Sequence, residues 1–219
     1  MKVEGPASVR EPGIALIAAG AITVAAILHH PTGEGATSAE FVASIVRAGG
    51  MLRLVHGAMI ALLLVISYGV TAYAMRRGLN RPLALLGLLT FVAGIFVMLP
   101  APLIDGFILP DFAARAQANP EVMAVFPAVA VFAMDMLLAF AKASSVLISL
   151  GIMLLSLGMM HERGVMRWFG LAGVIGTLPG ALAILAGRLQ LDLHGMTLIT
   201  VVWCVWFVGL GVLLVRGKL

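Results

Sequence analysis

The sequence predicts an all-α integral membrane protein, with six spanning helices in one membrane domain over residues 1–219. Of these residues 62% are hydrophobic and only 11% are charged, whereas soluble domains average about 45–50% apolar and about 25% charged residues. A water-facing globule could not be covered with so little polar surface. The other observation is a set of six apolar runs, each close to the length of about 20 residues that crosses a bilayer: 13–30, 51–75, 82–104, 137–160, 168–187 and 196–215.

The first run follows a leader in which Lys2 and Arg10 are balanced by Glu4 and Glu11. A secretory signal peptide has a leader with a net positive charge, and this leader has no net charge. The segment 36–39, Ala-Thr-Ser-Ala, resembles a cleavage site. We nevertheless expect the first run to be retained as a membrane helix.

Basic residues gather in the connections after the second and fourth runs and behind the sixth. Cytoplasmic connections are enriched in Lys and Arg, so this pattern predicts that both termini lie in the cytoplasm and that the protein is a multi-pass protein of the inner membrane. The net charge of +4 is then a topology signal, and nucleic acid is not expected as a partner. The residues are Arg76, Arg77, Arg81, Arg163, Arg167, Arg216 and Lys218.

The outer connections, 31–50, 105–136 and 188–195, contain helical patterns of their own. Residues 38–47 place four apolar side chains on one face, which favours a short helix lying in the membrane interface. The sequence Asn119-Pro120-Glu121 is a helix start signal. The apolar stretch from there to Met160 is too long for one span, so we expect an interfacial helix that bends near Pro127 before the span begins.

Glycines recur along one side of the fifth run, from Gly170 to Gly180, with Pro179 predicting a kink. Small residues let neighbouring helices approach closely. This face is therefore expected to pack within the bundle or against a membrane partner or a second copy of the chain.

A weak internal repeat relates His56–Gly94 to Lys142–Gly180 at a shift of 86 residues. The shared Arg-Gly…Arg turn is its best part, although common membrane-helix residues make chance matches easy. A real repeat would give a four-helix core from the second to fifth spans, with the first and sixth outside.

Arg53 and His56 lie three residues apart at the start of the second run, hence on one helical face. Ionisable groups are costly in hydrocarbon and therefore tend to face the bundle interior. In one interpretation His56 is a metal or haem ligand or a proton carrier, and Arg53 holds an anionic group. In the other, Arg53 reaches the headgroups and His56 makes one interhelical hydrogen bond.

Asp135 and Lys142 share a helical face but lie about 10 Å apart along it, so they are not expected to form a direct pair. Asp105, at the end of the third run, is a candidate partner for Lys142. These three residues complete the predicted ligand-binding set with Arg53 and His56. An ion pair that fixes helix register is an equally good interpretation.

The remaining candidate ligands are His29 at the end of the first run and Asp192 and His194 before the last. Imidazole and carboxylate suit a transition metal, and two histidines at one depth suit a haem. The metal set predicted is His56, His194, His29 and Asp192. Their spacing forms no metal motif, and the single cysteine, Cys204, excludes a cysteine-rich site.

Three functions follow as hypotheses. The first is a membrane-embedded enzyme or redox protein with a metal or haem near the outer leaflet. The second is an accessory subunit of a larger membrane complex. The third is a transporter of small solutes or ions, based on the repeat, Pro179 and Lys142.

Overall fold

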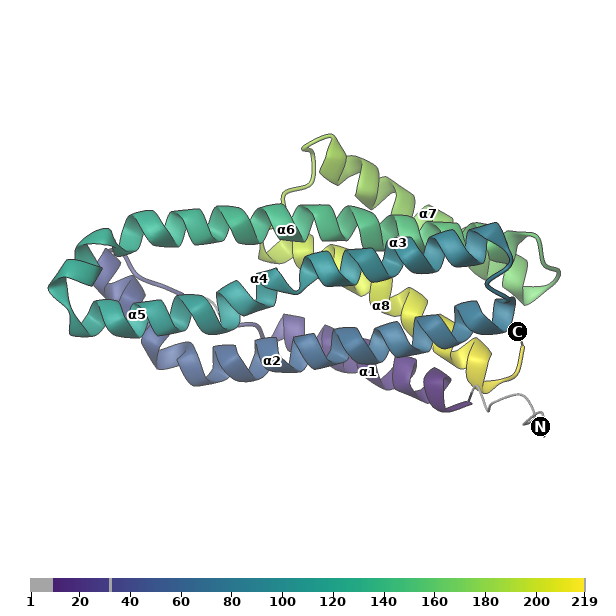
Figure 1. The fold of residues 1–219 in the computed structure, drawn as a ribbon, viewed down its shortest axis with the longest axis horizontal. Helices are drawn as coiled ribbons and strands as arrows, with labels where there is room; N and C mark the ends of the chain where they lie inside the picture. The colour runs from purple at the N-terminus through teal and green to yellow at the C-terminus, as the bar shows by residue number, and fades with distance from the viewer. Residues whose placement is uncertain (1–9, 32, 219) are drawn as a thin grey trace.

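The computed structural model describes residues 10–31 and 33–218; Lys2 and Glu4 of the leader lie outside them. Six helical segments are long and apolar enough to cross a membrane, which confirms the predicted all-α, multi-pass class (Figure 1). In chain order the elements are α1 (Arg10–Leu28), α2 (Ser38–Arg77), α3 (Pro82–Met98), α4 (Pro100–Leu103), the π-helical turn η1 (Ile104–Ile108), α5 (Leu109–Ala118), α6 (Pro120–Met160), α7 (Val165–Leu185) and α8 (Leu193–Val215).

Helix α2 combines the interfacial helix predicted at 38–47 with the span predicted at 51–75, so no separate interfacial helix is found there. A capping box starts it: the Thr37 hydroxyl accepts from the Glu40 backbone, and the Glu40 carboxylate accepts from the Thr37 backbone. Gly49 and Gly50 do not end the helix, and this part of α2 packs against α5. Tertiary packing outweighs their low helix propensity.

The third segment continues well past its predicted end at residue 104. Helices α3, α4 and α5 and the turn η1 follow one another without a loop, forming a 37-residue helical segment, Pro82–Ala118. Pro100, Pro102 and Pro110 lie at the joints. A proline removes a backbone donor and clashes with the preceding turn, and here the segment adapts with a π turn instead of stopping.

Helix α6 starts where predicted, with the Asn119 side chain accepting from the backbone of Glu121. It then runs unbroken through Pro127 for 41 residues, about 60 Å at 1.5 Å per residue. The predicted interfacial helix is thus the first half of α6. Because a bilayer core is about 30 Å thick, about half of this helix extends beyond the span.

The extensions of α2 and α6 and the whole of α5 form a distal lobe at the left of Figure 1, here defined as residues 38–53, 109–118 and 120–135. The lobe has an apolar core separate from that of the bundle. Its members are Val42, Ile45, Leu52, Leu109, Ala113, Ala116, Phe126 and Ala130.

In the bundle, α3, α6 and α7 pack in series, and α1 packs between α2 and α8. The expected four-helix core with the first and last spans outside is not supported. In the most apolar stretch of α8, 56% of the residues are buried, whereas the corresponding share in the other spans is 11–39%. Trp203 and Trp206 of α8 donate to Ser149 and Ser156 of α6, each at 3.0 Å, so the last helix belongs to the centre.

The glycine face of α7 is occupied within the molecule. Gly170 and Gly173 lie against Ser156 of α6, and Gly180 lies against Ile199 of α8. Close packing inside the bundle is therefore the correct interpretation of this pattern. Gly176 is exposed, and a contact of α7 with a membrane partner or a second copy stays a prediction.

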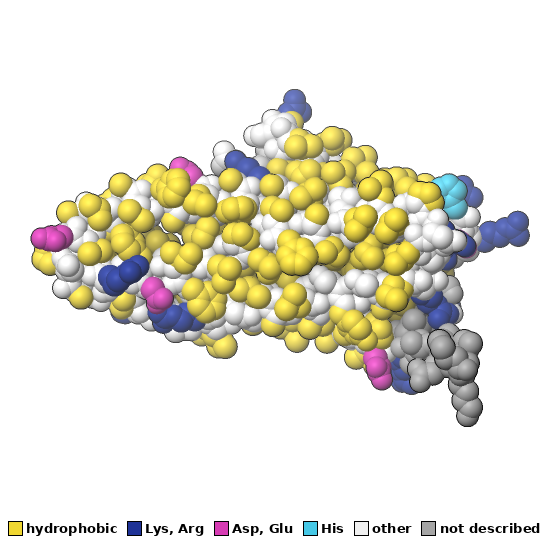
Figure 2. Space-filling model, viewed as in Figure 1, with side chains coloured by type: hydrophobic (Ala, Val, Ile, Leu, Met, Phe, Trp, Pro, Cys, Tyr) yellow, Lys and Arg dark blue, Asp and Glu magenta, His cyan; other side chains and the backbone are white. Residues whose placement is uncertain are grey.

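The α2–α3 and α6–α7 turns and the last turn of α8 lie together at one end, which we call the basic end. Arginine and lysine side chains gather there (Figure 2), and α1 begins at the same end. Arg77 contacts Glu162 across the two turns, and Arg81 Nη1 lies 3.3 Å from the same carboxylate.

Candidate metal centre

Three chemistry-bearing side chains from different segments lie at one depth, where the bundle meets the distal lobe. His56 precedes Arg77 by 21 residues on α2, and Asp105 follows Pro82 by 23 residues on the third segment. At 1.5 Å per residue both lie about 30–35 Å from the basic end. This distance is close to the thickness of a bilayer core.

His30 reaches the cluster from the connection between α1 and α2. Helix α1 ends at Leu28, and Pro31 keeps the residue before it out of helical geometry. The connection folds back on α2, where the Glu34 backbone donates to the Ser44 hydroxyl at 2.9 Å. His30 is half-buried, and its buried Nδ1 has no hydrogen-bond partner among the residues that the structure describes.

His56 is 3% exposed and is oriented by its own helix. Its Nδ1 lies 2.8 Å from the carbonyl oxygen of Leu52, one turn earlier, so Nδ1 carries a proton and Nε2 points into the cluster. The backbone of η1 passes directly over this ring at Gly106. A Cβ at that position would overlap the Cβ and ring of His56, so only glycine permits the approach.

Asp105 comes from the π turn η1, which directs its carboxylate between the two imidazoles. Its Oδ2 lies 3.2 Å from His56 Nε2 and 3.5 Å from His30 Nε2, and the two Nε2 atoms are 3.0 Å apart. The rings meet edge to face, with centroids 4.8 Å apart. The three donor atoms therefore form a compact triangle.

The triangle contains more lone pairs than two neutral histidines have protons to fill. With Nδ1 protonated, the Nε2 atom of neutral His56 is an acceptor, as is each oxygen of an ionised Asp105. A proton on His30 Nε2 can be donated either to His56 Nε2 or to the Asp105 carboxylate. The acceptor that does not receive it then faces another lone pair without a proton between them. A cation, either an extra proton or a metal ion, removes this repulsion.

The size of the triangle fits a small tetrahedral ion. Zinc binds imidazole nitrogen at about 2.0–2.1 Å and carboxylate oxygen at about 2.0–2.2 Å, which places neighbouring tetrahedral ligands about 3.3 Å apart. The observed separations of 3.0, 3.2 and 3.5 Å bracket this value. A bis-histidine haem does not fit, because a porphyrin has no room between Nε2 atoms 3.0 Å apart.

Of the predicted ligand-binding residues, His56 and Asp105 meet, whereas Arg53, Asp135 and Lys142 lie elsewhere. Arg53 pairs with Asp111 on the lobe surface. Asp135 and Lys142 are exposed on α6, and no ion pair of Lys142 with Asp105 is found within the described residues. The transport hypothesis thus lacks the buried lysine on which it relied.

The predicted metal ligands His29, Asp192 and His194 also lie outside the triangle. His29 is exposed, and its Nδ1 interacts with the carbonyl of Ala25. Asp192 caps α8 by accepting from the backbone of Gly195, and it lines an open hollow with His194. The adjacent His30 joins the triangle instead, and Pro31 is the sequence signal that distinguishes it from His29.

Comparison of the chain with protein families, with curated proteins and with solved structures finds no match.

Proposed function

We propose that this multi-pass membrane protein binds a divalent transition-metal ion through His30, His56 and Asp105. The observation that carries the proposal is the triangle of two imidazole nitrogens and one carboxylate oxygen, with sides of 3.0–3.5 Å. The donor set suits zinc best, since nitrogen and oxygen ligands in tetrahedral geometry are its common environment.

Three protein ligands leave one tetrahedral position for water or a substrate, which is the arrangement of catalytic rather than structural zinc sites. A zinc ion held by these residues would bring the pKa of a coordinated water near neutral and so would supply a nucleophile. The proposed chemistry is therefore metal-assisted hydrolysis at the membrane boundary.

The basic end supports an orientation with both termini in the cytoplasm and the metal centre at the outer boundary of the inner membrane. Seven arginine and lysine residues lie in or beside the two connections at that end and directly after α8. The ion would then be exchanged with the extracytoplasmic space rather than with the cytoplasm.

Metal analysis of the purified full chain tests the proposal. After equilibration with zinc and removal of free ion, the wild type should retain about one ion per chain, and Co²⁺ in its place should give a four-coordinate absorption spectrum. His56→Ala and Asp105→Asn should weaken binding by about tenfold or more, since even outer-shell changes cost that much at metal sites.

The control is His194→Ala, which removes a histidine at comparable depth outside the triangle. It should retain the metal with wild-type affinity. Equal zinc binding by the wild type and His56→Ala would overturn the proposal, as would a loss of zinc that His194→Ala reproduces.

A second candidate, an accessory subunit, is favoured by the exposed side of the lobe. Phe132 and Val131 of α6 are 64% and 63% exposed beyond the span, and Figure 2 shows hydrophobic side chains continuing onto the lobe. An apolar surface outside the bilayer is typical of a protein contact. Loss of a copurifying membrane protein from native membranes on Phe132→Ser would support this role.

A further inference from the structure

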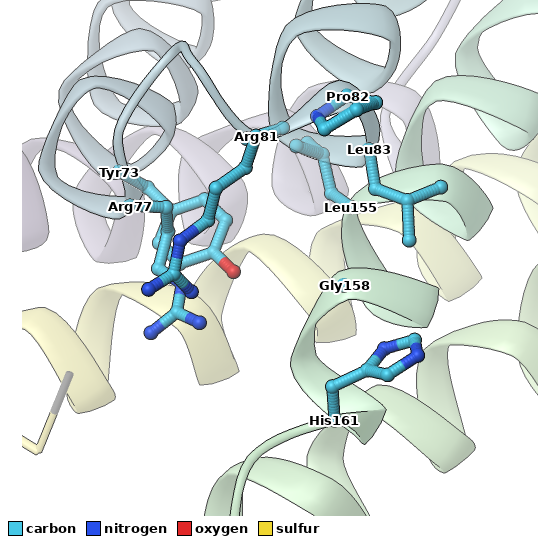
Figure 3. A pocket seen from close by; sticks show the side chains of 9 residues that line it. Tyr73, Arg77, Arg81, Pro82, Leu83, Leu155, Gly158 and His161 are labelled. Atoms are coloured by element: carbon cyan, nitrogen blue, oxygen red, sulfur yellow. The ribbon is translucent and has the colours of Figure 1, made fainter.

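A second polar site lies at the basic end, about one bilayer thickness from the metal centre. A cavity of about 240 Å³ lies between α2, α3 and α6, and Figure 3 shows the side chains that line it. Arg77 and Arg81 line one side of it, His161 lies across the opening, and Leu83 and Leu155 form apolar walls.

The arginines carry more charge than their acidic partner neutralises. Arg77 and Arg81 both contact one carboxylate, that of Glu162, so the group keeps one positive charge before His161 is counted. The Arg77 side chain is only 13% exposed, where charge is screened less than at the open surface. This residual charge favours an anion.

The buried Tyr73 supplies a hydrogen-bond donor to the same cavity. It is 1% exposed, yet no hydrogen bond of its hydroxyl is found within the described part of the chain. The first turn of α3, from Pro82 to Ala84, also lines the cavity, and the positive end of a helix dipole adds to the attraction for an anion.

We propose that this cavity binds a phosphate group, held by Arg77, Arg81 and the Tyr73 hydroxyl. The group belongs either to an anionic phospholipid of the adjoining leaflet or to a soluble phosphate compound. Basic pockets between membrane helices bind lipid phosphates, and the apolar Leu83 and Leu155 walls provide a surface for an acyl chain. The metal centre plays no part in this site.

The test uses the full chain in nanodiscs of phosphatidylcholine with increasing phosphatidylglycerol, with bound lipid counted by native mass spectrometry. A parallel arm titrates inorganic phosphate into detergent-solubilised protein by calorimetry. Arg81→Gln should weaken binding about fivefold, the effect of about one basic residue at a membrane surface. Glu162→Gln should strengthen it, because both arginines lose a competing carboxylate.

Arg76→Gln is the matched control, because Arg76 is an exposed arginine of the same turn that does not line the cavity. It should leave binding unchanged. Tyr73→Phe removes only the hydroxyl and should weaken binding without unfolding, which thermal denaturation checks in every variant.

A lipid site is identified if phosphatidylglycerol binds selectively and the variants change its binding in the predicted directions. If inorganic phosphate binding changes in these directions instead, the ligand is a soluble phosphate compound. The proposal is overturned if neither ligand binds, or if Arg76→Gln and Arg81→Gln weaken binding equally. Equal losses would mean a diffuse surface charge rather than a built pocket. Stronger binding on Glu162→Gln is the result that a purely structural ion pair does not produce.

Discussion

At the scale of single residues, the orientation of His56 decides what the proposed metal centre can do. Its Nδ1 is engaged by the Leu52 carbonyl, so the ring presents Nε2 to Asp105 and His30 and cannot easily turn away. A fixed ring loses less freedom on binding an ion than a mobile one. Metal-binding histidines are commonly held through their other nitrogen in this manner.

Two adjacent histidines provide a sharp test of the ligand set. Replacing His30 by Ala should weaken zinc binding by about tenfold or more, because one of three donors is lost. Replacing the neighbouring His29 by Ala should leave zinc binding unchanged, since His29 is exposed and its Nδ1 interacts with the carbonyl oxygen of Ala25. Equilibrium dialysis of both variants measures this, and a larger effect at His29 would show that the ligand is wrongly assigned.

Glu162 predicts a pH dependence at the other end of the molecule. Its hydrogen bond and charge interaction with Arg77 lower the pKa of the carboxyl below its ordinary value of 4.5. The ionised Glu162 carboxylate therefore stabilises the folded state above about pH 4.5, the ordinary pKa. This stabilisation is lost as the pH falls through the lowered pKa of the folded protein. Because the group is partly exposed, the contribution is at most about 1 kcal/mol.

Thermal denaturation of the wild type and Glu162→Gln at several pH values measures this contribution. The stability difference should be largest near about pH 7 and should narrow as the pH approaches about 4. Glu34→Gln serves as control, because no ion pair of this exposed glutamate is found in the described ranges. A difference that widens with acid would contradict the assignment.

At the scale of elements, the metal centre depends on how closely η1 approaches α2. We predict that Gly106→Ala abolishes zinc binding and destabilises the fold, because the added methyl overlaps His56. Gly57→Ala is the matched control: its Cβ would meet Phe107 at 3.7 Å, an ordinary contact, and alanine favours the helix. Metal content and melting temperature are measured for both variants. If Gly106→Ala keeps the zinc content and melting temperature of the wild type, the close approach of η1 to His56 is refuted.

At the scale of the whole molecule, the basic end and the distal lobe should lie on opposite sides of the membrane. In a variant without Cys204, cysteines at the exposed positions Gln117 and Asn80 report each side. An impermeant maleimide added to intact cells should label Gln117→Cys and leave Asn80→Cys unlabelled until the cells are lysed. The reverse pattern would invert the proposed topology. The wild-type thiol, 2% exposed in α8, should react in neither case.

The membrane class, the six spans and the meeting of His56 with Asp105 in depth could be predicted from composition and run length. The extension of α2 and α6 beyond their predicted spans could not be predicted, because the hydrophobic pattern of an interfacial helix is the same as that of a span that continues. Likewise the choice of His30 over His29 required the position of a helix end, which sequence patterns define poorly. The exposure of Lys142 depended on which face of α6 is buried.

The π turn η1 has a consequence for how this chain tolerates length changes. A π turn holds more residues than the 3.6 of an α-helical turn, so it shifts the phase of everything that follows. Five residues in a π turn complete about the same rotation as four in an α-helix. Deleting one residue between 104 and 108 would therefore restore regular winding and leave α5 facing nearly the same way, whereas a deletion within a regular part of the segment would rotate α5 by about 100°. Leu109 and Ala113 would leave the interior of the lobe only in the second case, so the π turn is the place in this segment where the loss of one residue should be tolerated.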